Sequence, residues 1–271
     1  MVSDMSLPLP TSLSPSKVAS FRDCALAFRF ATIDRLPEPT NVHAVKGTLV
    51  HRALELLLWE EPQGKRTLSA ALDRLVRARA ELATDREFVE LALTSDDDAM
   101  FVAEAEELLR RYFQLEDPNQ VQAIGLELMM EVNLGNLRLR GIIDRLEVRP
   151  DGSWILSDYK TGRVPGETRE LRAFFGLRFY ALVCWRSFGV IPKEIRLVYL
   201  SDPAVLTLNP HERMLIAFER QMQALGTAIR RALDLEDWRA RPSPFCMSCS
   251  FQKQCPAWAM SEPRGSSAGT A

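Results

Sequence analysis

Residues 141–162 read GIIDRLEVRPDGSWILSDYKTG, and this stretch decides the fold. Two apolar segments flank Pro150-Asp151-Gly152, a three-residue turn in which glycine supplies the positive φ angle. Such a turn sets an antiparallel register, which places Asp144 directly opposite Asp158. The stretch therefore predicts a β-hairpin that ends in two facing carboxylates.

The face that carries these aspartates changes from apolar to charged along the hairpin. Alternation puts the following residues on that face: Leu146, Val148, Trp154, Leu156 and, beyond Asp158, Lys160. Like charges directly opposite each other destabilise a sheet, and desolvation adds to the cost. A divalent cation between the carboxylates would offset that cost, because hard cations take oxygen ligands. The alternative is an exposed hairpin end whose charges are solvated.

The composition is that of an ordinary globular protein. The 271 residues are 46% hydrophobic and 26% charged, which suffices for one large domain or two small ones. The net charge of −2 gives no global field for nucleic acid, although a local basic groove remains compatible with it. The first residues, MVSDMSLPLPTS, lack the basic and apolar parts of a signal peptide. We expect a cytoplasmic protein with no membrane partner.

Hydrophobic periodicity predicts helices on both sides of a group of strands. Ser14 and Pro15 begin the first helix, over 14–30. Further helices are predicted at 44–60 and near 67–83, 86–93, 98–115, 170–188 and 210–234. Strands are predicted at 121–134, 136–148, 153–161 and 194–200. This order indicates one mixed α/β domain, between a disordered lead over 1–13 and a disordered tail over 261–271.

Two further groups could join the aspartates. His51 lies beside the apolar stripe of the helix 44–60, so it is either a half-buried structural histidine or a ligand. Glu127 lies in the strand 121–134 and shares its face with Glu131, which competes for any role given to Glu127.

Four motifs together resemble a known family. GIIDRLE and SDYKTG resemble the core of RecB-type nucleases in the PD-(D/E)XK superfamily, with the signature written as Asp144, Asp158-Tyr159-Lys160. GTLVHRALE, over 47–55, resembles that family's upstream histidine motif. LSPSKVASFRDCALAFRF, over 13–30, and PFCMSCSFQKQCPAW, over 244–258, resemble its N-terminal helix and its C-terminal cysteine cluster.

The resemblance implies a restriction-endonuclease-like α/β core, in which helices flank a central mixed sheet. A single nuclease domain would cover 14–260, with an N-terminal helical arm, a helical insertion at about 60–117 and a cysteine clamp at 246–255. Mg²⁺ or Mn²⁺ would be bound by His51, Asp144, Asp158 and the carbonyl group of Tyr159. The catalytic residues would be Lys160, Asp144, Asp158, Glu127 and Tyr180. The implied reaction is phosphodiester hydrolysis assisted by the metal.

One position departs from the family pattern. Relatives carry glutamine in a Gln-x-x-x-Tyr motif on the helix after the catalytic strands, whereas this chain has Gly176 there and retains Tyr180. Glycine weakens the helix and removes a polar side chain. The substrate contacts of this helix are therefore in question, while the metal ligands are unaffected.

The cysteines form a second candidate site. Cys246, Cys249 and Cys255 are closely spaced, and Cys24 is the candidate fourth ligand. Four thiolates suit either an iron–sulfur cluster or Zn²⁺. Resemblance to the iron–sulfur branch, which includes CRISPR-associated nucleases and AddB-type subunits, implies a [4Fe–4S] cluster that clamps the two chain ends. Cys184 lies in an apolar run and reads as a core residue.

The resemblance implies a metal-dependent DNA exonuclease that prefers single strands or ends, in DNA repair, recombination or defence. The chain has no GxxxxGK[ST] motif, so a helicase or another repair or defence protein would be its partner. The alternative is an inactive nucleic-acid-binding module with a structural metal cluster. Both predict a local basic groove, with these candidates: Arg22, Arg29, Arg52, Arg138, Arg140, Lys160, Arg163 and Arg178.

Overall fold

A computed structural model describes residues 10, 12–164 and 167–259 of the chain. The chain divides into two compact units, one over 40–220 and the other from 1–39 together with 221–271. The predicted tail over 261–271 lies outside the described residues, as does the predicted lead over 1–13 apart from residues 10, 12 and 13. The prediction of a single nuclease domain over 14–260 stays a prediction.

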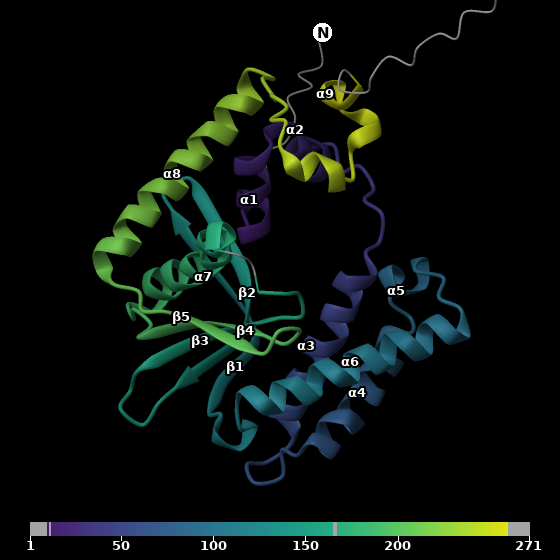
Figure 1. The fold of residues 1–271 in the computed structure, drawn as a ribbon. Coiled ribbons are helices and arrows are strands. Elements are labelled where there is room, and N and C mark those ends of the chain that lie inside the picture. The colour runs from purple at the N-terminus through teal and green to yellow at the C-terminus, as the bar shows by residue number, and fades with distance from the viewer. Residues whose placement is uncertain (1–9, 11, 165–166, 260–271) are drawn as a thin grey trace, which may run out of the picture. The chain divides into compact units, whose positions relative to one another are not determined.

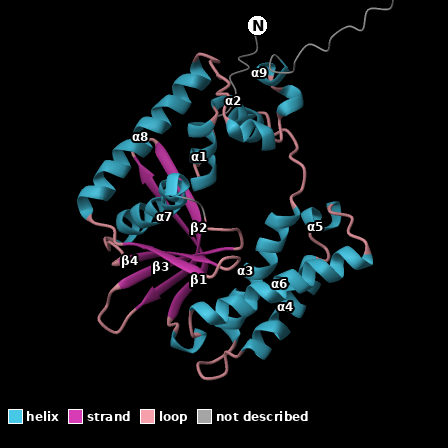
Figure 2. Ribbon diagram, viewed as in Figure 1, coloured by secondary structure: helices cyan, strands magenta, loops and turns pink. Residues whose placement is uncertain are grey.

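The unit over 40–220 is built on a mixed sheet whose five described strands follow the order β1-β2-β3-β4-β5 (Figure 2). The strands are β1 (Ala123–Leu134), β2 (Leu137–Val148), β3 (Trp154–Lys160), β4 (Glu194–Tyr199) and β5 (Ala204–Leu208). Only β3 and β4 pair in parallel. Helices flank this sheet, so the predicted α/β architecture with a mixed central sheet is confirmed.

The hairpin between β2 and β3 has the predicted register. The Arg149 N–H donates to the carbonyl oxygen of Ser153 at 2.9 Å, and Gly152 has φ +77°. Arg145 lies opposite Ser157 further along the ladder. The next step in this register carries Asp144 and Asp158, as the sequence predicts.

Five described helices belong to this unit (Figure 1). They are α3 (Val42–Glu60), α4 (Leu68–Leu82), α5 (Arg86–Glu90), α6 (Ser95–Leu115) and α7 (Glu167–Phe188). Of these, α3 and α7 pack on the sheet, while α4, α5 and α6 gather around α3. The side chain of Asn41 caps the start of α3, and a Thr94–Asp97 capping box begins α6. Apolar residues of α3, α4 and α6 form one core with Tyr159 and Val198 of the sheet. At the end of α7, Phe188 packs against Trp154.

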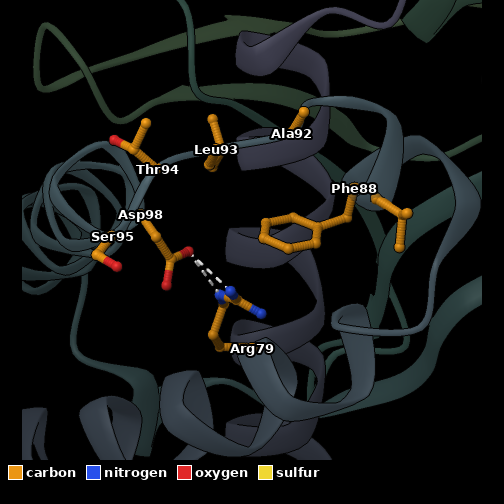
Figure 3. Close-up of a pocket in the computed structure, with 8 residues that line it drawn as sticks. Arg79, Phe88, Ala92, Leu93, Thr94, Ser95 and Asp98 are labelled. Atoms are coloured by element: carbon orange, nitrogen blue, oxygen red, sulfur yellow. Dashed lines mark hydrogen bonds and ion pairs between the residues drawn. The ribbon is translucent and has the colours of Figure 1, made fainter.

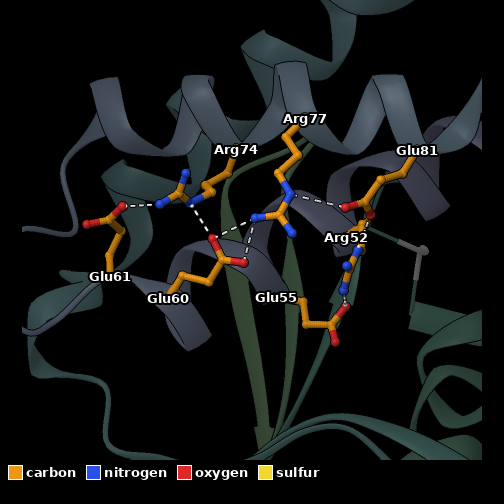
Figure 4. A network of polar contacts seen from close by, with 7 residues as sticks. All are labelled: Arg52, Glu55, Glu60, Glu61, Arg74, Arg77 and Glu81. Atoms are coloured by element: carbon orange, nitrogen blue, oxygen red, sulfur yellow. Dashed lines mark hydrogen bonds and ion pairs between the residues drawn. The ribbon is translucent and has the colours of Figure 1, made fainter.

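The polar sides of α3 and α4 are joined by a chain of ion pairs (Figure 4). Arg77 binds both Glu60 and Glu81, and Arg52 binds Glu81 at 2.7 Å. Arg52 also contacts Glu55 in its own helix. Because two carboxylates hold its guanidinium, Arg52 serves this helix pair rather than a basic groove.

The second unit contains both ends of the chain. Its described elements are α1 (Pro15–Asp23), α2 (Ala25–Phe28), a π-helical turn (Arg29–Ile33), the part of α8 (Glu212–Asp234) from 221 onward, two short 3-10 turns (Pro244–Ser248, Gln252–Gln254) and α9 (Pro256–Ala259). The sequence predicts one helix over 14–30, but Cys24 is extended, with φ −159° and ψ 110°. Trp238 stacks on Phe28 at 6.1 Å between ring centroids and closes the small core.

None of the helices in the described part of the chain is long and apolar enough to cross a membrane.

Candidate metal centre

Three elements of the unit over 40–220 bring a histidine and two carboxylates together. His51 lies on α3, Glu127 on β1 and Asp144 on β2. One ligand atom of each lies within 4.8 Å of the others. His51 Nδ1 is 3.5 Å from Asp144 Oδ2 and 3.8 Å from Glu127 Oε1. We call these three residues the ligand group.

Glu127 enters the ligand group from a strained position in β1. Its φ is +44°, in the left-handed region that costs a non-glycine residue about 1–2 kcal/mol. The register of β1 shifts between Ala123 and Gly125, just before Glu127. Glu131, its competitor on the same strand, is exposed and forms an ion pair with Arg138 at 2.6 Å. The structure thus places Glu127, and not Glu131, beside Asp144.

The backbone of Tyr159 connects two members of the ligand group. Its N–H donates to Asp144 Oδ2 at 2.7 Å, and its carbonyl oxygen accepts from His51 Nε2 at 3.1 Å. These bonds leave His51 Nδ1 facing the carboxylates. The carbonyl of Tyr159, which the resemblance implies as a ligand, lies at the site and is bonded by the imidazole.

Asp158 and Lys160 form an ion pair on β3. Asp158 is buried, whereas the Lys160 side chain is 43% exposed, so its ammonium can reach a bound molecule. Asp158 lies outside the group of three ligand atoms. His51 and Asp144, from the predicted ligand set, are therefore grouped with Glu127, while Asp158 is held by Lys160.

Burial and crowded negative charge shift the ionisation of the site. Burial, and then the charge of Asp158, raise the pKa of Asp144 to about 7. Burial lowers the pKa of His51, but the hydrogen bond of Glu127 and the charge of Asp144 outweigh it, so that the pKa is raised. Burial likewise opposes protonation of Lys160, and Asp158 more than compensates, which raises the pKa of the ammonium. The site therefore accumulates protons that a cation would displace.

Tyr180 of α7 lies close to the same charges. Burial and then the carboxylates of Asp158 and Asp144 raise the pKa of its hydroxyl, which keeps the phenol neutral. Its ring packs on Gly141, where an added Cβ would lie 2.5 Å from the Tyr180 ring. Glycine at this position of β2 thus allows the close approach of α7 to the site. Gly176 is one turn earlier on α7 and offers no side chain for a substrate contact.

A buried arginine, which the sequence analysis missed, lies on the opposite face of the hairpin. Arg145 is 0% exposed and forms ion pairs with Glu116 and with Glu147, the latter at 3.0 Å. It also donates to the Tyr159 hydroxyl and, at 3.2 Å, to Ser157. The side chain of Tyr159 is thereby fixed on one face while its backbone contacts the ligand group. The sequence signal that could have revealed this buried position is an arginine within the apolar strand 136–148.

The donor set fits a hard divalent cation. Two carboxylates and an imidazole are ligands that Mg²⁺, Mn²⁺ and similar ions accept. Besides burial, the charges of Asp158 and, to a smaller extent, Glu127 raise the pKa of Asp144, so the carboxylates at this site repel one another. Bringing a positive ion to them removes that repulsion.

The four predicted cluster cysteines all belong to the unit formed by the chain ends. All four thiols are free of disulfides. Backbone N–H groups of Arg241 and Ser243 donate to the sulfurs of Cys24 and Cys246, at 3.5 and 3.4 Å. Burial raises the pKa of Cys249, and the charges of the three other thiols add to it. Within the described part of the chain, no three of these sulfurs lie within 4.8 Å of one another.

A separate hollow lies at the start of α6 (Figure 3). Arg79 donates to Asp98 at 2.7 Å and covers the Phe88 ring at 4.0 Å from its centroid. The guanidinium is therefore neutralised and stacked, and this hollow gives no site for an anion. Asp98 belongs to the acidic run that the sequence places at a helix start.

The fold brings a histidine and two carboxylates that could hold a cation to one mixed sheet, and comparison with known proteins supplies the family. Residues 12–256 match the model of the PD-(D/E)XK nuclease superfamily, and the chain belongs to that superfamily. It is 26% identical to the Gene 69 protein of Mycobacterium phage D29 over 274 residues, which cover 90% of this chain and 96% of the phage protein.

A solved structure shares the fold. The crystal structure of a "putative exonuclease" from Eubacterium rectale has a TM-score of 0.56 and 12% sequence identity, over 93% of this chain and 88% of that one. At this identity, the likeness supports the α/β fold and no residue roles.

Proposed function

We propose that this protein is a Mg²⁺- or Mn²⁺-dependent deoxyribonuclease that hydrolyses phosphodiester bonds at single-stranded DNA or at DNA ends. The observation that carries the proposal is the ligand group, His51, Glu127 and Asp144, with Lys160 and Asp158 on the neighbouring strand. Membership of the PD-(D/E)XK nuclease superfamily supports phosphodiester hydrolysis as the reaction.

His51, Glu127 and Asp144 would hold the ion, with Asp158 and the carbonyl of Tyr159 close by. When bound, the ion supplies a Lewis acid and a hydroxide nucleophile at neutral pH. Lys160 stabilises the negative charge that develops on the phosphate, because its ammonium is charged and partly exposed. Glu127, on the same side of the site, would help to orient the attacking water. The neutral hydroxyl of Tyr180 donates to a phosphate oxygen.

The choice of ends and the biological process are finer parts of this proposal. The resemblance to RecB-type nucleases supports an exonuclease in DNA repair, recombination or defence, which receives unwound DNA from a helicase or another protein. The "putative exonuclease" name of the Eubacterium rectale protein is compatible with this mode.

We further propose that Cys24, Cys246, Cys249 and Cys255 hold a [4Fe–4S] cluster. Four free thiols converge in one unit, which supports a thiolate-bound metal. The choice of a [4Fe–4S] cluster over Zn²⁺ rests on the resemblance to the iron–sulfur branch of the family, since thiolates suit either.

A cleavage assay tests the nuclease proposal. Labelled single-stranded and duplex DNA, with either the 5′ or the 3′ end blocked, is incubated with Mg²⁺, Mn²⁺ or EDTA. We expect degradation with either metal and none with EDTA, and a loss of about 100-fold or more for Lys160→Ala and for Asp144→Ala.

The matched control is Glu107→Gln, an exposed carboxylate of α6 outside the ligand group, and it should cleave as the wild type does. Intact DNA with wild type and variants alike would end the nuclease proposal. The inactive nucleic-acid-binding module would then stand, provided that the protein still binds DNA.

A further inference from the structure

The β1–β2 hairpin carries an exposed face that starts at the ligand group. Glu127 lies between the pairs Leu126–Arg145 and Leu128–Ile143, so it faces Asp144 across the two strands. Alternation then places three further pairs on the same face. These residues, which we call the ribbon face, are Met129 with Ile142, Glu131 with Arg140, and Asn133 with Arg138. All six are exposed.

The first pair beyond the carboxylates is apolar. Met129 is 52% exposed and Ile142 is 44% exposed. They lie directly across from each other, about 7 Å along the strands from Glu127 and Asp144. Hydrophobic side chains exposed beside a charged site are typical of a surface that contacts a ligand.

The next two pairs contain two arginines, Arg140 and Arg138, which differ in whether a carboxylate binds them. Arg138 is occupied, because it donates hydrogen bonds to Glu131 at 2.6, 2.8 and 3.2 Å. Arg140 contacts the sulfur of Met129, at 2.8 and 3.1 Å, and it pairs with no carboxylate of the described residues. Its guanidinium is thus available to a phosphate, which arginine binds through paired hydrogen bonds.

We propose that the ribbon face holds single-stranded DNA next to the candidate metal centre, with a base on Met129 and Ile142 and a phosphate on Arg140. This inference rests on the proposed nuclease function and names the form of its substrate. Flat base faces are free to meet the apolar pair only in an unpaired strand, because a duplex stacks them. The thioether of Met129 adds a favourable contact with an aromatic ring.

The proposal is tested by binding and cleavage measurements on variants of exposed residues, which leave the core intact. Binding is measured in the Lys160→Ala background, by fluorescence anisotropy with a labelled oligonucleotide. Ile142→Ala should weaken binding of an ordinary single strand about fivefold, through lost apolar contact, and leave binding of an abasic strand unchanged. Arg140→Gln should weaken both and reduce the slope of log Kd against log salt by about 0.7.

Matched controls are Val76→Ala and Arg86→Gln, exposed residues of α4 and α5, and both should bind as the parent does. In the otherwise wild-type protein, the ribbon variants should raise KM for single-stranded DNA and leave kcat unchanged.

The outcomes separate this inference from the proposed function. If wild type cleaves DNA while the ribbon variants bind and cleave like the controls, the ribbon inference fails and the nuclease function stands. An equal loss of affinity for ordinary and abasic strands with Ile142→Ala also overturns it. If wild type does not cleave but the ribbon variants lose binding as predicted, the DNA surface stands and the nuclease function fails.

Discussion

Glu127 shows at the scale of one residue how a ligand position can conflict with stability. Its left-handed backbone turns the side chain toward His51 and Asp144 in the middle of a strand. Glycine adopts this conformation without strain, while carrying no ligand atom. Strained positions of this kind persist where the side chain serves a site.

The substitution Glu127→Gly should therefore stabilise the metal-free protein by about 1 kcal/mol and weaken Mn²⁺ binding. Thermal unfolding and isothermal titration with Mn²⁺ measure the two effects. Glu131→Gly is the control, because Glu131 has no strained backbone and glycine should destabilise the strand there. Lower stability for both variants would contradict the strain argument.

Asp144 gives the site a dependence on pH. Its pKa is raised to about 7 from an ordinary value of 3.8, so the folded protein keeps a proton that the unfolded chain loses. The stabilisation from this group is complete below about pH 4 and is lost as the pH rises through about 7. The cation requires the carboxylate form, and its affinity should rise over the same range.

Mn²⁺ should bind about tenfold more tightly at pH 8 than at pH 6, since the ionised fraction of a group with a pKa of about 7 changes by that factor. The raised pKa of His51 acts in the same direction. Titration calorimetry at both pH values measures the affinity, and Asp144→Asn should reduce the difference. Equal affinities for the wild type at the two pH values would show that Asp144 is ionised without metal.

At the scale of the elements, Arg145 joins the end of α6 to the β2–β3 hairpin. Glu116 directly follows α6, and Arg145 binds both this carboxylate and the Tyr159 hydroxyl. The backbone of Tyr159 also bonds to Asp144 and His51. The network around Arg145 therefore holds the residue to which these two members of the ligand group are bonded.

Replacement of this buried cation should be costly. Arg145→Met should lower the free energy of unfolding by about 3–5 kcal/mol, because Glu116 and Glu147 would lose a buried partner. Tyr159→Phe removes one hydroxyl and should cost about 1 kcal/mol. Urea unfolding measures both, and Arg149→Met, an exposed position on the same hairpin, should change stability by less than about 0.5 kcal/mol. Similar values for Arg145→Met and Arg149→Met would refute the network's role.

The elements also show what could be predicted from the sequence. The Pro-Asp-Gly turn sets the hairpin register locally, so the placement of Asp144 and Asp158 was predictable. The strand β5, only five residues long, was missed because it follows β4 after a short turn and offers little pattern. The break of the first helix at Cys24 depends on contacts with residues more than 200 positions away, such as Arg241.

Some residues of the candidate site could likewise be predicted from the sequence, and others could not. The family resemblance implied His51, Glu127, Asp144 and Lys160, whereas alternation alone could not choose between Glu127 and Glu131. That choice depends on the local irregularity of β1, which no periodic pattern contains. The ion pairs of Arg145 join segments far apart in the chain, and one sequence does not reveal such pairs.

At the scale of the whole molecule, the proposed cluster would join the two chain ends. Cys24 is the one predicted ligand from the N-terminal side, and a cluster bound through it would close a loop of more than 200 residues. A cross-link across so long a loop removes much of the entropy of the unfolded chain.

Protein purified without oxygen should contain about four irons per chain and show broad visible absorbance that bleaches on reduction. Cys24→Ser should lose the iron and expose both chain ends to limited proteolysis, since the clamp would be broken. Cys184→Ser, in the apolar part of α7, is the control and should retain the iron. Stoichiometric zinc without iron in the anaerobic protein would overturn the cluster assignment.

The two candidate sites use residues from different parts of the chain, and this has a consequence for how their sequences can change. Every candidate group of the cleavage chemistry falls between His51 and Tyr180, inside the unit over 40–220, while all four thiols belong to the other unit. Selection can therefore act on each set alone. Replacement of the four thiols by apolar side chains would leave the candidate cleavage residues in place.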